Sequence, residues 1–563
     1  MLIPDDQLKK LLIKNRVIDD AVSRNVSSYA QNLNISFSDA LIEKTILTDE
    51  QLGELTAKYL KFPFITLSKI TITEEVFRLI PERMAKKHKI IAFTKSGGGL
   101  KVAMSDPTNT ELLSLLSKKV GRKIIPYLAT ERDIRKTYQI YKKELQRAFD
   151  ELVLKESEGK SAITALDEVP VATIVDMLIN HANLDTASDV HIEPQETSSL
   201  VRFRIDGILH DVLIFPKNLH DRFITRIKLL SRLRTDEHLS PQDGKMRVKY
   251  DGEQIDIRVS IIPTVDGEKV VLRLLPSRSR LFSFADLGMN KKDLKKLNDA
   301  LDKTHGMILA TGPTGSGKTT TIYAVLKTLN VREKNITTIE DPVEYKIKGI
   351  NQIHVNSRTN LGFANGLRSI LRQDPNIIFV GEIRDIETAG IAVNAALTGH
   401  IVLSTLHTND AATALPRLID MKVEPFLVAS TINVIVAQRL VRKICDVCKT
   451  TLSIKKSDME THIARDMIRK HFGNDSTIKT FKGAGCKICN FTGYAGRIGV
   501  FEVLEVSKEI RKLIVNKADA DVITKQAVEE KMNTMLDDGL EKVKDGETTF
   551  EEILRVLKID ATE

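Results

Sequence analysis

Residues 312–319 have the composition and spacing of a loop that binds a polyphosphate. They read Gly-Pro-Thr-Gly-Ser-Gly-Lys-Thr, which matches the pattern G-x-x-x-x-G-K-[ST]. Glycines allow the backbone to wrap closely around phosphates with its N–H groups pointing inward. Lys318 would reach the β- and γ-phosphates, and the Thr319 hydroxyl would bind Mg²⁺. The residues predicted to bind ATP are Gly312, Pro313, Thr314, Gly315, Ser316, Gly317, Lys318, Thr319 and Thr320.

The residues on either side of this loop support the same interpretation. Residues 307–310 are apolar and predict a buried strand, and residues 319–329 predict a helix. A helix N-terminus directly after the loop would add partial positive charge at the phosphates. This strand–loop–helix order favours a phosphate-binding loop over an ordinary glycine-rich turn.

Two acidic residues at predicted strand ends could complete a triphosphatase site. Glu382 ends the apolar segment 376–382, and Glu340 lies in the segment 336–344, a second strand that ends in acids. The carboxyl ends of parallel strands border the ligand crevice of an α/β sheet. We expect Glu382 to act on the Mg²⁺ side, directly or through water, and Glu340 to polarise the attacking water. Taken singly, each acid could instead be a solvated strand end or a helix N-cap.

Three further residues could contact the nucleotide. His407 follows an apolar strand-like segment and could sense the γ-phosphate through a hydrogen bond. The alternative is a partly buried histidine whose hydrogen bonds are satisfied elsewhere. Arg258 and Arg273 lie on two predicted strands upstream of the core and could stabilise charge in the transition state. Surface ion pairing is the alternative for both arginines.

All four cysteines fall into two C-x-x-C pairs, Cys445/Cys448 and Cys486/Cys489. This arrangement in a cytosolic protein predicts a structural zinc site with four thiolates. The 37 residues between the pairs indicate that a small subdomain fills the gap. Two disulfides would be unusual in a reducing compartment, and one redox-active pair would leave the second pair unexplained.

Composition places few restrictions on function. The 42% hydrophobic and 28% charged content is typical of globular proteins. Lys and Arg exceed Asp and Glu by 84 − 75 = 9, a mild excess that permits contact with nucleic acid or an anionic membrane but requires neither. The sequence has no apolar run of about 18 residues and no secretory signal pattern, so we expect a cytoplasmic protein.

Element patterns divide the chain into several units. Residues 48–52 predict a capped helix start, and residues 90–104 predict a hairpin. Strands and helices alternate around the phosphate loop, which implies a mainly parallel sheet. The predicted units are an N-terminal domain (1–145), a polar linker or exposed helix (146–168), a second α/β domain (169–284), the core (285–440), the four-cysteine subdomain (441–500) and a C-terminal helical region (501–563).

A set of short motifs resembles a known family over roughly residues 40–510. They are similar to motifs of the secretion ATPase superfamily, in the branch of type II secretion and type IV pilus assembly ATPases. The retraction ATPases of type IV pili resemble the same core, but they lack the four-cysteine insertion and the long N-terminal domain. The motifs occupy residues 187–194, 241–244, 267–269, 312–320, 338–344, 362–375, 380–385, 395–400 and 404–410.

This resemblance implies a multidomain α/β protein with a RecA-like P-loop ATPase core, a PAS-like second domain, an α+β N-terminal domain and a zinc-binding subdomain. It implies a homohexamer that uses ATP, Mg²⁺ and Zn²⁺ beneath an inner-membrane platform protein and its associated assembly proteins. Rotation of the second domain against the core would move that platform. The protein would be peripheral at the inner face of the membrane and would not bind nucleic acid.

The resemblance also implies roles for individual residues. Glu340 matches the family's catalytic acid, Glu382 its metal-side acid and His407 its histidine box. Arg258 and Arg273 match phosphate-contacting arginines of the second domain.

The chain departs from the family pattern at several positions. The family often has Arg where this chain has His238 and Lys245. We therefore expect Arg247 and the two strand arginines to contact the phosphates instead. Some relatives bind cyclic di-GMP through Arg-Leu-Gly-x-x-Leu repeats. Residues 34–41 lack the Arg-Leu-Gly start, so we do not expect that ligand.

Two other hypotheses fit parts of the sequence. A nucleic-acid motor could use a similar core, but no segment interleaves aromatic and basic residues as a single-strand platform would, and Trp is absent. A nucleotide-gated scaffold without activity would not need Lys318, Glu340 and Glu382 together. The sequence leaves open whether pilus assembly or secretion is served.

Overall fold

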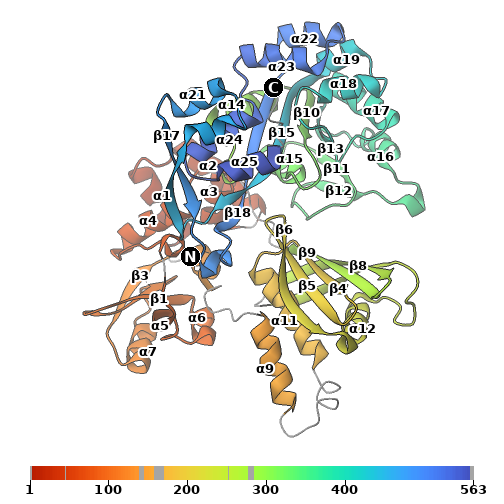
Figure 1. Cartoon of the computed structure of the whole chain (residues 1–563). Coiled ribbons are helices and arrows are strands. Elements are labelled where there is room, and N and C mark those ends of the chain that lie inside the picture. The colour runs from red at the N-terminus through yellow and green to blue at the C-terminus, as the bar shows by residue number, and fades with distance from the viewer. Residues whose placement is uncertain are drawn as a thin grey trace.

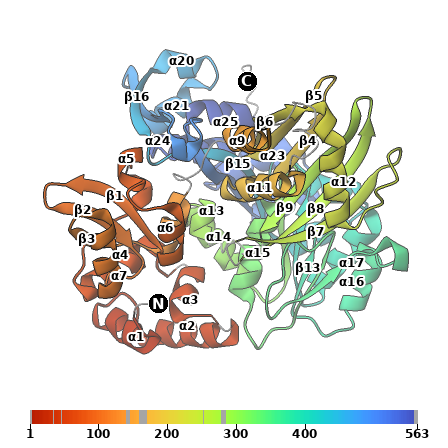
Figure 2. The same cartoon turned by 90° about the horizontal axis from the view of Figure 1, so that it is seen from below.

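The structure is a computed structural model that describes residues 3–33, 35–44, 46–70, 72–138, 145–157, 170–250, 253–276 and 284–557 (Figure 1). It is a mixed α/β protein of several domains. In both views the N-terminal domain (red to orange) lies at the left, and the second domain (yellow) lies to its right, next to the core (green to cyan) (Figures 1 and 2). No helix in these described ranges is both long and apolar enough to cross a membrane.

The N-terminal domain has two parts, each with its own apolar core. Four helices form the first part, and the predicted capping box is confirmed at Thr48 and Gln51. The second part is a sheet in the order β1-β2-β3, and the predicted hairpin is the antiparallel β1–β2 pair. The elements are α1 (Asp5–Lys14), α2 (Asp20–Leu33), α3 (Phe37–Glu43), α4 (Asp49–Leu60), α5 (Glu74–Phe77), α6 (Glu82–His88), β1 (Ile90–Ser96), β2 (Gly99–Met104), α7 (Thr110–Val120), β3 (Ile124–Leu128) and α8 (Glu131–Thr137).

The second domain is an antiparallel sheet in the order β6-β5-β4-β9-β8-β7, and α11 and α12 contribute to its apolar core. Burial alternates along β5, as expected for a strand with one buried face. Helix α9 lies in the predicted linker, but its Leu145 and Phe149 are buried in this same core. The elements are α9 (Leu145–Ser157), α11 (Val171–Leu184), β4 (Asp189–Pro194), β5 (Ser198–Ile205), β6 (Ile208–Pro216), α12 (His220–Ser231), β7 (Gln242–Tyr250), β8 (Glu253–Thr264) and β9 (Gly267–Pro276).

The core sheet has the order β12-β11-β13-β14-β10-β15-β18 and is parallel except for β18. Strand β10 is buried along its whole length because helices cover both faces of the sheet. Met307 and Leu309 pack with α16, α17 and α18, whereas Ile308 and Ala310 pack with α14 and α15. The elements are α13 (Phe284–Leu287), α14 (Lys291–Leu301), β10 (Gly306–Thr311), α15 (Lys318–Leu329), β11 (Ile336–Glu340), β12 (Asn351–His354), α16 (Phe363–Ile370), β13 (Ile377–Val380), α17 (Ile386–Leu397), β14 (Ile401–Leu406), α18 (Ala414–Asp420), α19 (Pro425–Thr431), β15 (Ile432–Ile444) and β18 (Tyr494–Glu505).

The cysteine subdomain is an insertion between β15 and β18, so the core sheet continues beyond residue 440. It contains an antiparallel β16–β17 pair and two short helices. The predicted C-terminal region begins at residue 501, but residues 501–505 are the end of β18, and helices follow from Lys508 to Leu557. The elements are β16 (Lys449–Lys455), α20 (Lys456–Glu460), α21 (Arg465–Phe472), β17 (Thr477–Gly483), α22 (Lys508–Val515), α23 (Ala520–Glu529), α24 (Met535–Lys544) and α25 (Phe550–Leu557).

A buried carboxylate fastens the C-terminal helix α25 to strand β15. The Glu552 side chain is only 2% exposed and pairs with Arg442 on β15 and with Arg555. Burial raises its pKa, but hydrogen bonds from Arg555 and Arg442 outweigh burial and lower the pKa to about 2. A carboxyl whose pKa is lower in the folded state than in the unfolded state stabilises the fold above its unfolded pKa. That stability is lost as pH falls from about 4.5 towards about 2.

We therefore expect Glu552→Gln to lower the free energy of unfolding by about 3 kcal/mol near neutral pH. The difference from wild type should shrink towards pH 3, because the Glu552 carboxyl then binds a proton in the unfolded chain but not in the folded one. Urea unfolding followed by circular dichroism measures both values. Glu551→Gln, at the exposed neighbouring position, is the control. An equal loss of stability from both variants, or a difference that does not depend on pH, would contradict the role of this carboxylate.

Candidate functional site

The carboxyl ends of four neighbouring parallel strands bring the predicted site residues to one edge of the core sheet. The strands lie in the order β11-β13-β14-β10. Glu340 ends β11, Glu382 follows β13, His407 follows β14, and the phosphate loop follows β10. This edge is where open α/β sheets bind ligands.

The loop between β10 and α15 has the backbone shape of a phosphate cradle. Gly312, Gly315 and Gly317 have φ values of 144°, 80° and 92°, which glycine adopts without strain. A Cβ at Gly312 would lie 2.5 Å from the carbonyl oxygen of Gln438. Helix α15 begins at Lys318 without a side-chain cap, so its first N–H groups are free to bind an anion. The buried Ser316 hydroxyl finds no hydrogen-bond partner in the described part of the chain, which also fits a polar ligand here.

Lys318 lies inside this cradle and not in solvent. Its Nζ donates hydrogen bonds to the carbonyl oxygens of Gly312 (2.7 Å) and Pro313 (3.1 Å). Burial lowers the pKa of Lys318, and the charge of Glu382 partly offsets this effect. A partly desolvated ammonium interacts more strongly with a phosphate than one in water.

Gln438 on β15 supports the loop, and sequence reasoning missed it. Its Nε2 donates to the carbonyl oxygen of Ser316 (2.8 Å), and its Oε1 accepts from the Thr321 hydroxyl (2.7 Å). One side chain therefore joins the loop, the helix and the neighbouring strand. The sequence offered one sign of this role. Gln438 and Arg439 are the only polar residues in the apolar segment 434–441.

Glu340 is almost fully buried, at 2% exposure, and its carboxylate is held by three side chains. Thr338 and Gln352 donate to Oε1 at 2.6 and 3.2 Å, and Tyr323 donates to Oε2. Burial raises the pKa of Glu340, while these hydrogen bonds lower it. A desolvated carboxylate with a raised pKa is suited to accept a proton from water. Sequence reasoning missed Tyr323, whose helical position carried no sign of this contact.

Glu382 lies at the centre of a second polar group. Its Oε2 pairs with Arg384 Nε at 2.9 Å and with His407 Nε2 at 3.3 Å. The Glu382 side chain is 14% exposed, whereas that of His407 is 43% exposed. Thr319, the predicted second Mg²⁺ ligand, is half-buried in the first turn of α15. Carboxylate and hydroxyl oxygens suit this cation.

The two strand arginines differ in their surroundings. Arg258 Nη2 lies 3.6 Å from the Glu344 carboxylate, so the second domain meets the acidic segment of the core. Arg273 Nε pairs with Asp189 at 2.9 Å within the second domain, which is the ion-pair alternative for this residue.

Arg247 and His238 also form pairs within the second domain. Arg247 pairs with Asp256 across β7 and β8. His238 Nδ1 lies 2.7 Å from the buried Glu268 carboxylate. Asn34, at the start of the segment compared with the cyclic di-GMP repeat, lies outside the described residues.

The four thiols converge, as their sequence spacing predicts. All four sulfur atoms lie within 4.8 Å of one another. The Sγ–Sγ distances are 3.8 Å for Cys445–Cys486 and Cys448–Cys489, and 3.7 Å for Cys486–Cys489. A tetrahedron of thiolates around zinc, with Zn–S bonds of about 2.3 Å, has S–S edges of about 3.8 Å. The donor set therefore fits zinc, and the distances rule out disulfides.

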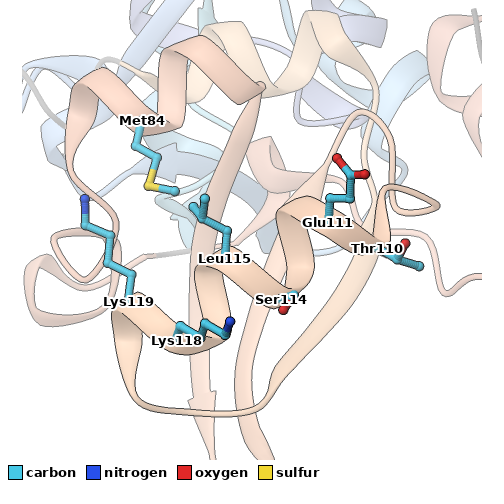
Figure 3. A pocket seen from close by; sticks show the side chains of 7 residues that line it. All are labelled: Met84, Thr110, Glu111, Ser114, Leu115, Lys118 and Lys119. Atoms are coloured by element: carbon cyan, nitrogen blue, oxygen red, sulfur yellow. The ribbon is translucent and has the colours of Figure 1, made fainter.

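Figure 3 shows an open hollow on the N-terminal domain, between α6 and α7. Except for Met84, the residues that line it are exposed. It contains none of the predicted catalytic or binding residues, so the sheet edge remains the candidate site. The lining residues are Met84, Thr110, Glu111, Ser114, Leu115, Lys118 and Lys119.

Known proteins resemble this chain over most of its length. The family model of the type II/IV secretion system protein matches residues 164–555, and the MshEN domain model matches residues 60–147. The type IV pilus assembly ATPase PilB of Myxococcus xanthus is 37% identical over 560 residues, 97% of this chain and 98% of that protein. The type II secretion system protein E of Pseudomonas aeruginosa is 44% identical over 394 residues, 70% and 76% of the two chains.

The fold has solved counterparts. The crystal structure of the Legionella pneumophila ATPase DotB covers 68% of this chain and 94% of its own, with a TM-score of 0.50 and 21% identity. At that identity it supports the fold only. The family model and the two relatives go further: this chain belongs to the type II/IV secretion system family and is an ATP-hydrolysing enzyme.

Proposed function

We propose that this chain is a cytoplasmic motor that assembles as a homohexamer and drives type IV pilus assembly or type II protein secretion. It would act through an inner-membrane platform protein and its associated assembly proteins. The relative named as a pilus assembly ATPase matches nearly the whole of both chains, which supports pilus assembly ahead of secretion.

One observation carries this proposal. The phosphate loop, Glu340, Glu382 and His407 lie at the ends of four adjacent parallel strands. A triphosphatase needs a cradle for the phosphates, a carboxylate for the cation and a base for water, and this edge supplies all three.

Each residue has a separate task in this proposal. The backbone N–H groups of residues 312 and 314–320 and Lys318 Nζ would hold the phosphates of ATP; Pro313 has no N–H and would only shape the loop. Thr319 and Glu382 hold Mg²⁺, which would neutralise charge on the β- and γ-phosphates when bound. Glu340 orients water and accepts its proton, and His407 contacts the γ-phosphate from beside Glu382.

Contacts between domains support a coupling of hydrolysis to movement. Arg258 on β8 reaches Glu344, four residues after Glu340. The Asp206 carboxylate accepts a hydrogen bond from the Gly496 N–H at 2.8 Å, which joins the second domain to the start of β18. A rotation of the second domain would therefore change its contact after β11, near one edge of the core sheet, and its contact with β18, at the opposite edge.

We assign Zn²⁺ to the four cysteines as a structural ion. Backbone N–H groups of Gly485, Cys486 and Gly493 donate to cysteine sulfur atoms at 3.1–3.3 Å. Hydrogen bonds of this kind stabilise thiolate charge around a structural metal.

Stimulation of hydrolysis separates this motor from a nucleic-acid motor. The purified platform protein in vesicles should increase ATP turnover, and single-stranded or duplex DNA should not. DNA-stimulated turnover without a response to the platform would contradict the proposal.

Lys318 and Glu340 should affect catalysis in different ways. Lys318→Ala removes a charge from the phosphates, so ATP binding and turnover should both fall. Glu340→Gln keeps the size but removes the base, so binding should persist while kcat falls by about 10²-fold or more. Titration with a fluorescent nucleotide and steady-state hydrolysis measure the two effects. Equal loss of nucleotide affinity in both variants would refute the assignment of Glu340.

The cysteine subdomain should contain about one zinc ion per chain by elemental analysis. Cys445→Ser should lower the metal content and the thermal stability of the subdomain while leaving the chemical step of ATP hydrolysis intact. Asp446→Asn, at the exposed position beside it, is the matched control and should keep the metal. A metal-free wild-type protein with unchanged stability and full activity would contradict the assignment of a structural zinc ion.

Catalysis should require the second domain and a ring. A fragment of residues 285–563 should bind ATP but hydrolyse it poorly, and ATPase activity per full-length chain should rise with protein concentration. Adding the second domain should restore activity to the fragment, and a second domain carrying Arg258→Ala and Arg273→Ala should not. If the fragment turns over ATP as fast as the full chain at equal concentration, both the arginine role and the need for a ring are wrong.

A further inference from the structure

Tyr323 connects the phosphate-loop helix to the candidate catalytic acid. It lies on α15 and its side chain is fully buried. Its ring packs edge-on against Tyr345 (centroids 4.6 Å apart) and Phe379 (6.4 Å). These contacts hold the ring in one orientation, so the position of its hydroxyl is fixed as well.

The Tyr323 hydroxyl is held by hydrogen bonds within the core. It donates its proton to Glu340 Oε2. It accepts from the backbone N–H of Glu344 at 3.3 Å and from Gln352 Nε2 at 3.4 Å. The Gln352 amide has two hydrogens and two nearer acceptors, Glu340 Oε1 and the Tyr345 carbonyl, each at 3.2 Å, so the firm bonds of the hydroxyl are those to Glu340 and from Glu344.

The hydrogen bonds to Glu340 leave only one of its oxygens able to accept a further bond from water. A carboxylate has about four acceptor positions, two on each oxygen. Thr338 and Gln352 fill both positions on Oε1, and Tyr323 fills one on Oε2. The remaining position is on Oε2, the oxygen that Tyr323 holds.

The Tyr323 hydroxyl lies between the phosphate-loop helix and the residue that contacts the second domain. Thr319, the candidate Mg²⁺ ligand, is four residues before Tyr323 on α15, so the two share one face of the helix. Glu344 donates its N–H to Tyr323, and its carboxylate lies 3.6 Å from Arg258 of the second domain. Docking of the second domain at Glu344 can therefore shift the group that holds Glu340.

We propose that Tyr323 is a positioning residue: its hydroxyl aims Glu340 Oε2 at the attacking water and transmits the Arg258–Glu344 contact to that carboxylate. This inference rests on the proposed role of Glu340. It assigns to Tyr323 no contact with the nucleotide itself.

Tyr323→Phe in the full-length hexamer tests the positioning role, because it keeps the ring and removes only the hydroxyl. We expect kcat for ATP to fall about tenfold, since a small misplacement of a catalytic group is costly. KM and nucleotide affinity should stay within about twofold, since the phosphate cradle is untouched. Tyr345→Phe is the matched control. The Tyr345 ring packs on Tyr323, and its hydroxyl feels the charge of Glu340 but makes no hydrogen bond to it among the described residues, so this variant should keep wild-type kcat.

A wild-type kcat in Tyr323→Phe would overturn the proposal. A parallel loss of kcat and nucleotide affinity would overturn it too, because a structural defect gives that result. If Tyr323→Phe does not fold, fluorotyrosine at position 323 keeps ring and hydroxyl and strengthens the donor. Its kcat should then differ from wild type while its nucleotide affinity does not, and an unchanged kcat would count against the proposal.

Glu344→Gln tests the link to the second domain. It should lower kcat in the wild-type background and have little further effect in the Tyr323→Phe background, because both changes act through one hydroxyl. Fully multiplicative effects would refute the link. Glu340→Gln separates the two proposals. If this variant retains turnover, the proposed role of Glu340 is wrong. If it abolishes turnover and Tyr323→Phe keeps wild-type kcat, only the role of Tyr323 is wrong.

Discussion

The pairing of β10 with β14 on one side and β15 on the other is the constraint on which the rest of the structure depends. Strand β10 is buried on both faces, so its register against its neighbours is set by packing as well as by hydrogen bonds. Because β11, β13 and β14 run parallel to it, their ends meet at one edge with the phosphate loop. The loop can lie close to β15 only because Gly312 has no side chain there.

Burial then shifts the pKa values of the two principal charged groups of the candidate site. It lowers the pKa of Lys318 and raises that of Glu340, and each shift works against the charged form. Both groups offset this cost with hydrogen bonds from the protein: Lys318 to loop carbonyls and Glu340 from Tyr323, Thr338 and Gln352. Groups held in this way are oriented before any ligand arrives, which is how enzymes avoid reorganisation during the reaction.

The other domains contact the core near the phosphate-binding edge and at strand β18. The second domain touches the acidic segment through Arg258 and the start of β18 through Asp206. The cysteine subdomain interrupts the chain between β15 and β18, and Ile488 from its second cysteine pair packs against the core of the N-terminal domain. Strand β15 also supplies Gln438 to the phosphate loop. The phosphate loop, the four-cysteine cluster and both upstream domains are therefore connected through the neighbouring strands β15 and β18.

The sequence alone determined the local elements and the groups with fixed spacing. The phosphate loop, the capping box at Thr48 and the β1–β2 hairpin could be predicted because neighbouring residues specify them. The convergence of the four cysteines could be predicted because two C-x-x-C pairs together supply the ligands of one zinc site. It did not reveal that α9 packs on the second domain, that β15 continues past residue 440, or that Gln438 and Tyr323 support the site. It also could not distinguish Arg258, which meets the core, from Arg273, which pairs with Asp189 in its own domain. Only the tertiary structure decided these, because each depends on contacts between residues far apart in the chain, whose partners no local pattern specifies.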